Sequence, residues 1–326
     1  MPTVLVTGSS GFVGSCARTA FASAGWHSIG IGRRPTSQDD YLRCDLSKPF
    51  SGNLVSAIER SDVVIHAAAR SSPWGTKRQF RQANVVATEK IVEACQAAGQ
   101  PKLIFLSSSS IFYRPEDQIG IDESTVPAEP AVNHYAATKQ IAETIVRRYE
   151  GRWTILRPRA VYGKGDTVLF PRILAAAQAG RLPLLTRPGD PVVGDLISID
   201  HLTDCLVKAA QDDTIEGEFN LTDNAPQEIV SFLLGVFERL EIPRPKREIP
   251  VSTAFRFAHV LELIYGGLMP WREPPITRFG VHVFAYSKVF KVDKMLRAFG
   301  QPKLSTEQSV ERFVEWVQHD NPYGLK

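Results

Sequence analysis

The chain has 326 residues, enough for one large domain or two unequal ones, and its 43% hydrophobic and 22% charged residues are typical of a globular protein. A net charge of +3 without a long basic block argues against a nucleic-acid partner, and the four scattered cysteines have no metal-binding spacing, so no metal site is expected. No apolar run reaches the roughly 18 residues of a membrane span, and a strand starting at Thr3 leaves no room for a signal peptide, so we expect a cytoplasmic protein.

The first half of the chain alternates short apolar runs with helical patterns. This alternation is typical of a parallel sheet with helices on both faces. We therefore predict an α/β fold built on a doubly wound parallel sheet. The expected strands are 4–7, 28–31, 63–66, 103–106 and 153–156, and the expected helices run from the first glycine-rich turn to about Ser23, from Asn84 to about Ala98 and from Tyr135 to Tyr149.

After Gly163 the composition changes. Residues 182–193 are rich in proline, glycine and leucine, whereas 196–199 and a helix from His201 indicate a return to the first fold. From residue 226 onward the pattern is helical and more apolar. A smaller, mostly helical second domain is therefore expected to be interleaved with the first. The predicted division assigns 1–175 and 195–225 to the first domain, and 176–194 and 226–326 to the second.

A glycine-rich turn joins the first strand to the first helix. It contains Gly8, Gly11 and Gly14, with Phe12 and Val13 between the last two. In this context glycines indicate a phosphate site, because they let the backbone approach a pyrophosphate while the helix amino end offers N–H donors. The alternative is a tight turn that binds no ligand.

The residues after the second strand indicate which dinucleotide binds in the first domain. An NAD site generally has an acidic side chain there, which accepts a hydrogen bond from the ribose 2′-hydroxyl. This chain has Gly32, Arg33 and Arg34 instead. Planar guanidinium donors suit a 2′-phosphate. NADP(H) is therefore the predicted cofactor, and a solvated basic loop is the alternative.

Two further segments are candidates for the same cofactor site. Asp45 and Leu46 follow a further presumed strand, between 28–31 and 63–66, and could contact an adenine edge. An aspartate in a surface turn, directly before a serine, fits that stretch almost equally well. The other segment consists of three small residues that leave room beside a nucleotide, namely Ala67, Ala68 and Ala69.

Tyr135 and Lys139 are four residues apart and therefore share one face of the expected helix. An ammonium there can stabilise the phenolate, lowering a phenol pKa that is about 10 when unperturbed. A tyrosine tuned in this way can exchange a proton with a substrate oxygen near neutral pH. The spacing alone also occurs on solvated helix edges. The glycine turn upstream and the serines at 107–110, which end a strand, favour an active site instead.

Together these segments resemble an extended short-chain dehydrogenase/reductase over nearly the whole chain. The resemblance rests on 7–14, 66–69, 84–88, 106–109, the Tyr135/Lys139 pair and 156–163. Within that superfamily of NAD-dependent epimerases and dehydratases, Trp74 with Gly75, 157–159 with 163–166, and 275–279 look like the 3β-hydroxysteroid dehydrogenase branch. They most resemble its bacterial 2-alkyl-3-oxoalkanoate reductases.

The resemblance implies a role for each site residue. Tyr135 would be the acid/base, and Lys139 would lower its pKa and hold the nicotinamide ribose. Ser109 would hydrogen-bond the substrate oxygen, with a shift of one position along the serine run as the alternative. From the residues alone, Asn84 is equally an N-cap of the helix expected to begin there. The resemblance places Asn84, Ser107 and Pro158 beside the cofactor, and Trp74 beside the substrate.

The second half of the chain predicts a large apolar substrate. Residues 254–265, 268–271 and 281–284 are apolar stretches that could line a ligand site or simply pack a core. Arg278 is the candidate anchor for a carboxylate, which favours a long-chain β-keto or β-hydroxy acid over a 3β-hydroxysteroid. The implied reaction is hydride transfer between NADP(H) and a ketone or secondary alcohol. A homodimer and association with a membrane surface are both compatible with these features.

Two other functions remain open. A nucleotide-sugar epimerase or dehydratase shares the fold and the tyrosine–lysine pair. The dehydratases of the superfamily, however, have an Asp-Glu pair where this chain has Ser110 and Ile111, and its epimerases usually retain NAD. The second alternative is a non-catalytic NADP(H)-binding sensor, although such proteins commonly lose the catalytic tyrosine that this chain keeps.

Overall fold

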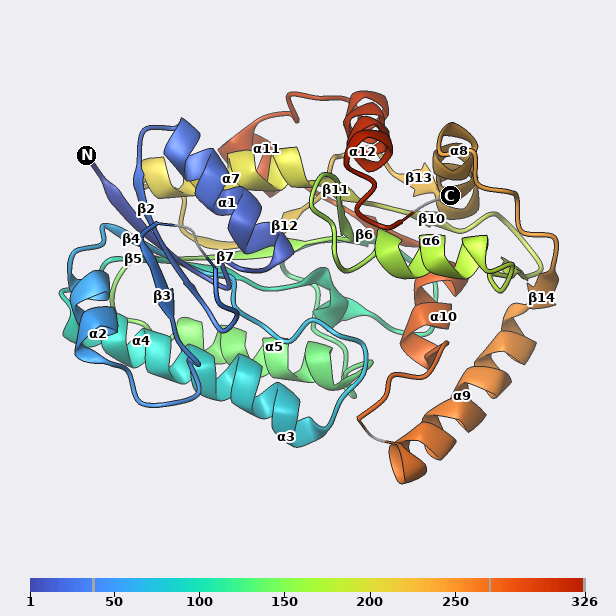
Figure 1. The fold of residues 1–326 in the computed structure, drawn as a ribbon, viewed down its shortest axis with the longest axis horizontal. Coiled ribbons are helices and arrows are strands. Elements are labelled where there is room, and N and C mark those ends of the chain that lie inside the picture. The colour runs from blue at the N-terminus through green and yellow to red at the C-terminus, as the bar shows by residue number, and fades with distance from the viewer. Residues whose placement is uncertain (37–38, 270, 325–326) are drawn as a thin grey trace.

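The computed structural model describes residues 1–36, 39–269 and 271–324. Among these residues, seven strands form one parallel sheet in the order β12-β7-β5-β4-β1-β2-β3 (Figure 1). The strand order reverses between β1 and β4, which is where open α/β sheets bind ligands at the carboxyl ends of their strands. The strands are β1 (Thr3–Thr7), β2 (His27–Gly32), β3 (Tyr41–Arg43), β4 (Val63–His66), β5 (Lys102–Leu106), β7 (Trp153–Pro158) and β12 (Gly217–Leu221).

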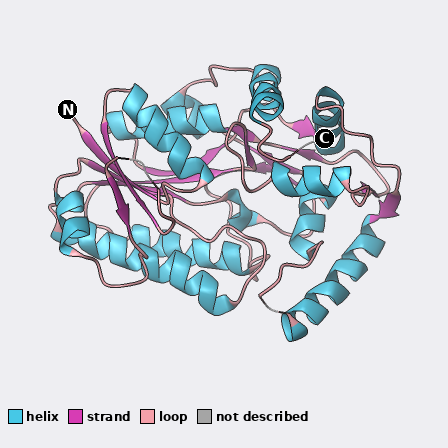
Figure 2. Cartoon of the chain, in the orientation of Figure 1, coloured by secondary structure: helices cyan, strands magenta, loops and turns pink. Residues whose placement is uncertain are grey.

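Helices cover both faces of this sheet, which confirms the predicted doubly wound fold (Figures 1 and 2). Alternate residues of β1 point to opposite faces: Val4 and Val6 belong to one buried cluster and Leu5 to the other. Because both faces are covered, the strands are apolar throughout. One face packs against α1 (Phe12–Ser23), α7 (Ile199–Gln211) and α11 (Asp293–Phe299), and the other against α2 (Gly52–Glu59), α4 (Ala87–Ala97) and α5 (His134–Val146).

The helix expected to begin at Asn84 begins earlier. Thr76 and Gln79 form a capping box that starts α3 (Lys77–Phe80). The chain then continues through a π-helical turn (Arg81–Val86) directly into α4. Asn84 therefore lies inside a continuous helical segment, and the alternative that it caps a helix is wrong.

The remaining elements form a second lobe beside α5 and α7. It is mostly helical, as predicted, but it also contains a small mixed sheet in the order β13-β10-β15-β6. The helices of this lobe are α6 (Phe170–Gln178), α8 (Ile229–Arg239), α9 (Val251–Leu268), α10 (Arg278–Ala285) and α12 (Thr306–Asp320). The strands of that sheet are β6 (Gln118–Ile121), β10 (Val193–Gly194), β13 (Gln227–Glu228) and β15 (Lys288–Phe290). Four further short strands form two separate pairs, β8 (Val161–Tyr162) with β11 (Ile197–Ser198) and β9 (Leu184–Thr186) with β14 (Glu248–Pro250).

The chain returns from the second lobe to the first after β15. Phe290, Met295 and Phe299 are buried in the same cluster as Phe219 of β12, and the rings of Phe219 and Phe299 meet edge to face with centroids 5.2 Å apart. The domain division made from the sequence remains a prediction. Within the described residues no helix is long and apolar enough to cross a membrane, and no group of His, Cys, Asp or Glu could hold a metal ion.

Candidate active site

The turn after β1 can be built only with glycine at two positions. Gly8 has a φ of +71°, and a Cβ on it would lie 2.8 Å from the Cα of Ala68. A Cβ on Gly14 would lie 2.3 Å from the carbonyl oxygen of Gly8. The amino end of α1 has Gly11 as its N-cap and receives no side-chain cap. Its N–H groups are therefore available to an anion, which fits the expected pyrophosphate cradle.

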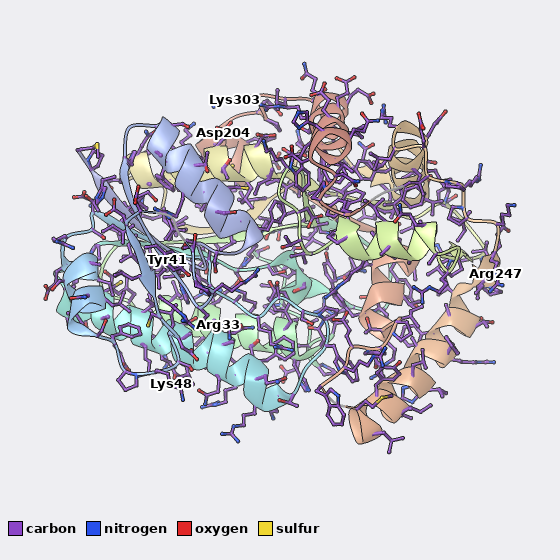
Figure 3. The ribbon with its side chains drawn as sticks, viewed as in Figure 1. Arg33, Tyr41, Lys48, Asp204, Arg247 and Lys303 are labelled. Atoms are coloured by element: carbon purple, nitrogen blue, oxygen red, sulfur yellow. The ribbon has the colours of Figure 1, made fainter. Side chains whose placement is uncertain are left out.

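One large cavity, of about 1660 Å³, begins at this turn and crosses the molecule. Figure 3 shows Arg33 near the β2–β3 edge and Arg247 at the far end beside α9, and both line this cavity. Most residues predicted for the site are thus brought together. The predicted residues that line it are Gly8, Gly11, Phe12, Val13, Gly14, Arg33, Arg34, Asp45, Leu46, Ala67, Ala68, Ala69, Ser107, Ser109, Tyr135, Lys139 and Pro158.

The loop after β2 presents two exposed arginines to the cavity. Its backbone is held in place, because Arg43 Nε donates to the carbonyl oxygen of Arg33 over 3.1 Å and the Tyr41 hydroxyl donates to that of Arg34 over 2.5 Å. Asp45 closes a turn by accepting from the backbone N–H and hydroxyl of Ser47. Partial burial works against ionisation of Asp45, but these hydrogen bonds and nearby Arg33 leave its pKa below the ordinary value. Asp45 therefore lies in a surface turn and at the cavity wall at once.

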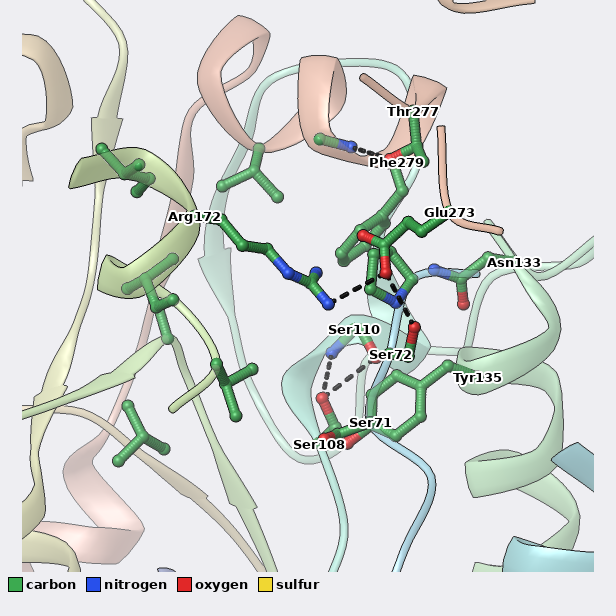
Figure 4. Close-up of a pocket in the computed structure, with 18 of the residues that line it drawn as sticks. Ser71, Ser72, Ser108, Ser110, Asn133, Tyr135, Arg172, Glu273, Thr277 and Phe279 are labelled. Carbon is green, nitrogen blue, oxygen red and sulfur yellow. Dashed lines mark hydrogen bonds and ion pairs between the residues drawn. The ribbon is translucent and has the colours of Figure 1, made fainter. Parts of the chain in front are cut away.

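Ser108, rather than Ser109, is the serine that meets Tyr135. Ser108 opposes the rise in the pKa of Tyr135 through its side chain, and its hydroxyl accepts from the backbone N–H of Ser110 over 3.2 Å (Figure 4). Ser109 points elsewhere, with its hydroxyl 3.4 Å from that of Tyr113. The 3₁₀-helix of Ser109–Phe112 starts at this point and turns successive side chains in different directions. The geometry therefore favours the one-position alternative in the serine run.

Lys139 is almost completely buried behind Tyr135. Its ammonium donates to the carbonyl oxygen of Leu106 over 2.7 Å and lies 4.5 Å from the ring centroid of Phe105. Burial lowers the pKa of Lys139 to about 7, against the opposing effect of Glu143. Burial likewise raises the pKa of Tyr135 to about 12, against the opposing effect of the Ser108 side chain. Desolvation is the largest effect on the pKa at both residues, and the expectation that Lys139 lowers the pKa of Tyr135 stays a prediction.

An acidic residue one helical turn beyond Lys139 organises the strand ends around it. Glu143 accepts from Arg157 through both carboxylate oxygens, at 2.9 and 2.8 Å. It also accepts from the Ser107 hydroxyl over 2.6 Å. Ser107 is thus held by Glu143 although it borders the cavity. The pair of Glu143 and Arg157 fixes α5 against β7, and so fixes the position of Lys139.

Three predicted site residues lie outside the cavity lining. Asn84 is buried, and its amide connects the backbone of Arg70 to the Thr138 hydroxyl of α5, at 2.7 and 3.0 Å. Trp74 lies against α9 at Gly266. Arg278 is paired with Glu262, with 2.6 Å between Nε and Oε2, so its guanidinium is already occupied. The structure therefore does not bring these three side chains into the cavity that the other predicted residues line.

The second half of the cavity is mostly apolar, and one ion pair lies in its lining. Its apolar wall comes from α6, α8, α9 and α10. Arg172 of α6 donates to Glu273 over 3.0 Å, and the Ser72 hydroxyl donates to the same carboxylate oxygen over 3.2 Å. Figure 4 shows this ion pair on the side of the pocket that faces Ser108 and Tyr135. Apolar residues of the wall include Leu184, Leu185, Leu233, Ile249, Phe257 and Phe284.

The sequence reasoning missed several polar residues that border the cavity. Asn133 caps α5 by accepting from the N–H of Ala136 over 2.8 Å, and its amide nitrogen has no partner among the described residues. Its position two residues before Tyr135 was the available signal. Arg159 follows Pro158 directly, which was the signal for that residue. Arg172 carried none, because its site partner is 101 residues away.

The fold and this arrangement of glycine turn, serine, tyrosine and lysine define an extended short-chain dehydrogenase/reductase. The model of the NAD dependent epimerase/dehydratase family matches residues 4–221, which is more than half of the chain. The chain belongs to that family.

Relatives with assigned activities match nearly the full length. A 2-alkyl-3-oxoalkanoate reductase of Stenotrophomonas maltophilia (strain K279a) is 29% identical, over 95% of this chain and 97% of its own. One of the same name from Shewanella oneidensis is 28% identical, over 94% and 84%. A 3beta-hydroxysteroid-dehydrogenase/decarboxylase of Arabidopsis thaliana is 26% identical, over 86% and 52%.

Solved structures show the same fold at lower identity. MoeE5 in complex with UDP-glucose and NAD has a TM-score of 0.75 at 18% identity, over 98% of this chain and 100% of its own. The UDP-glucuronic acid 4-epimerase of Bacillus cereus, in complex with NAD, has a TM-score of 0.73 at 19% identity, over 97% and 99%. At such identity the likeness concerns the fold.

Proposed function

We propose that this protein is an NADP(H)-dependent oxidoreductase that interconverts a ketone and a secondary alcohol on a large apolar substrate. The substrate would be of the 2-alkyl-3-oxoalkanoate type or, failing that, the 3β-hydroxysteroid type. The proposal rests chiefly on one observation: a single cavity joins the glycine turn, the Ser108–Tyr135–Lys139 cluster and an apolar wall. Cofactor, proton donor and apolar substrate would therefore share one space.

The residues present fit a dinucleotide. Gly8 and Gly14 leave no room for a side chain at the turn, and the free amino end of α1 points to the same place. Arg33 and Arg34 border the cavity at the end of β2, where a ribose 2′-phosphate would lie. When bound there, the nicotinamide dinucleotide would supply or accept the hydride.

The protein's own contribution is proton transfer and alignment. Because its pKa lies well above neutrality, Tyr135 holds its hydroxyl proton and can donate it to the oxygen of a ketone under reduction. Ser108, whose side chain interacts with Tyr135, would align that oxygen. Lys139, held by the Leu106 carbonyl, would bring positive charge toward the ribose and the developing phenolate.

The apolar wall supports a lipid-like substrate over a nucleotide sugar. A sugar diphosphate needs several donors along its path, whereas leucine, isoleucine and phenylalanine make up most of the wall in the far half of this cavity, with Arg172, Arg181 and Arg247 among them. The names of the first two relatives support the same choice. The epimerase alternative keeps some support from the solved structures with this fold. Cytoplasmic location, a homodimer and membrane-surface association remain predictions from the sequence.

The test is turnover with defined substrates. Purified protein and NADPH would be incubated with a 2-alkyl-3-oxo acid, with a 3-oxosteroid, and with UDP- and dTDP-sugars, while absorbance at the reduced-nicotinamide band is followed. We expect NADPH oxidation with the oxo acid. Conversion of a nucleotide sugar without net cofactor oxidation would support an epimerase. Tight NADPH binding with no turnover of any substrate would support the sensor.

A further inference from the structure

Arg159, the second arginine at the end of β7, differs from Arg157 because no described residue hydrogen-bonds to its guanidinium or forms an ion pair with it. Arg159 follows Pro158 at the carboxyl end of β7, its backbone N–H donates to the carbonyl oxygen of Leu221, and its residue is only 3% exposed. It nevertheless lines the cavity. Arg157, two residues earlier, is equally buried but is satisfied by both oxygens of Glu143.

The Arg159 guanidinium makes neither an ion pair nor a side-chain hydrogen bond with any residue that the structure describes, and its Nε is buried without a partner. Its guanidinium carbon lies 5.2 Å from the ring centroid of Tyr113, and the carboxylate of Asp195 interacts with it electrostatically without a hydrogen bond or ion pair between them. A buried guanidinium whose hydrogen bonds are not satisfied is costly, even with a carboxylate nearby. Such a group is expected to meet an anion during function.

Two further charged groups lie near Arg159, one of each sign. Lys288 lies on the same Tyr113 ring, with its ammonium 5.8 Å from the centroid, and gives its hydrogen bonds to the carbonyl oxygens of Arg114 and Glu116. Asp195 interacts electrostatically with Arg159 but accepts its hydrogen bonds from the backbone N–H of Phe290 and from Thr222. Burial raises the pKa of Asp195 to about 6 despite these contacts.

Arg159 lies at the catalytic end of the cavity. Tyr113, on which it stacks, has its hydroxyl 3.4 Å from that of Ser109 and interacts electrostatically with Tyr135. The other face of this region is closed by Phe279, whose ring stacks on Tyr113 with centroids 6.2 Å apart. A ligand whose oxygen reaches Tyr135 can therefore present a second polar group to Arg159.

We infer that Arg159 binds the carboxylate of the substrate, so that the enzyme acts on a 3-oxo acid and not on a neutral sterol. This inference rests on the proposed oxidoreductase function. In a 3-oxo acid the carboxylate is two bonds from the reacting carbon, which matches an anchor beside the proton donor. A planar guanidinium binds a carboxylate through two parallel hydrogen bonds, and the alkyl chains then extend along the apolar wall.

The first experiment compares two substrates that differ only in the acid group. kcat/KM would be measured for a 2-alkyl-3-oxo acid and for its methyl ester in the wild type, in Arg159→Gln and in Arg159→Lys. We expect Arg159→Gln to lower the acid-to-ester ratio about 10- to 100-fold, since one charge-assisted contact is lost. Arg159→Lys keeps the positive charge but cannot make two parallel hydrogen bonds, and should lower the acid-to-ester ratio less than Arg159→Gln does. Arg278→Gln, which removes a cation outside the cavity, should leave the ratio unchanged.

A second measurement is independent of turnover. Binding of decanoate and decan-1-ol would be measured by thermal shift for the same variants. The anchor is supported if the wild type prefers decanoate, Arg159→Gln loses this preference and Arg159→Lys keeps part of it. If the same protein turns over no oxo acid, the proposed reaction alone fails. Turnover of oxo acids with an acid-to-ester ratio unchanged in Arg159→Gln overturns the anchor alone. Loss of the ratio in Arg172→Gln but not in Arg159→Gln would transfer the role to Arg172 and also overturn it.

Discussion

Lys139 donates to the carbonyl oxygen of Leu106 over 2.7 Å, so the end of β5 and the middle of α5 are joined directly behind the proton donor. The ammonium is desolvated there, and the pKa of Lys139 falls to about 7 as a result. A buried lysine lowers the free energy of unfolding when it is protonated. That cost is measurable because it depends on pH.

The folded-state pKa of Lys139 lies below its ordinary value of 10.5, so the unfolded chain binds more protons between pH 7 and 10.5. The free energy of unfolding should therefore rise with pH in this window through Lys139, and the cost should be complete below pH 7. We predict that Lys139→Met flattens the rise between pH 7 and 9 and stabilises the protein by on the order of a few kcal/mol at pH 7. Denaturant unfolding at several pH values measures this. The exposed Lys77→Met is the control, and a wild-type slope in Lys139→Met would contradict the prediction.

Tyr135→Phe should reduce kcat by roughly 10²–10⁴ while leaving NADPH affinity nearly intact, because only the proton donor is removed. The serine run offers a matched comparison. Ser108→Ala should reduce kcat far more than Ser109→Ala, since only the Ser108 hydroxyl meets Tyr135. Steady-state kinetics and NADPH fluorescence titration separate the two effects. The reverse order of the serine variants would restore Ser109 as the substrate contact.

Arg33→Ala should weaken NADPH binding by ~1.5–3 kcal/mol and NADH binding much less, because the lost charge-assisted hydrogen bonds involve the 2′-phosphate. Titration of both cofactors measures the difference. Lys48→Ala removes an exposed cation near the same loop that does not line the cavity, and should affect the two cofactors equally. Equal losses in Arg33→Ala would refute the preference for NADP(H).

The apolar wall predicts a dependence on alkyl length. Each methylene buried should add ~0.8 kcal/mol, or about fourfold in kcat/KM, until the cavity is full. Ala176 of α6 lines this part of the cavity, so Ala176→Phe should shift the optimum to shorter chains without affecting NADPH binding. A homologous series of 2-alkyl-3-oxo acids provides the measurement. A flat profile in the wild type would show the wall to be structural only.

The fold was predictable because its signals are local. Val4, Leu5 and Val6 read as a strand buried on both faces, and Gly14 sits where any side chain would collide with Gly8. Whether a run is strand or helix depends on neighbours a few residues apart. Right-handed crossovers then limit the strand orders that such a sheet can adopt. The start of the helix around Asn84 was predicted wrongly, because the capping box that begins this helical segment lies eight residues upstream, at Thr76.

The polar contacts of the substrate half could not be predicted in this way. Arg278 and Arg159 look equally suited to a carboxylate in the sequence, but Glu262 occupies the first and no side chain occupies the second. That difference is made by tertiary contacts. The choice between Ser108 and Ser109 is similarly decided by the direction of a single 3₁₀ turn.

The return of β15 and α11 to the main sheet bears on how such an enzyme can be altered. Phe290, Val292, Met295 and Phe299 complete a core whose other buried members lie before residue 222. A recombinant chain truncated at residue 222 would leave this core exposed to solvent. A substrate lobe taken from a relative would bring that relative's β15–α11 side chains into the same core. Substrate specificity can therefore be altered by substituting individual side chains of the cavity. Replacing the whole lobe would also change the hydrophobic core that the lobe shares with the main sheet.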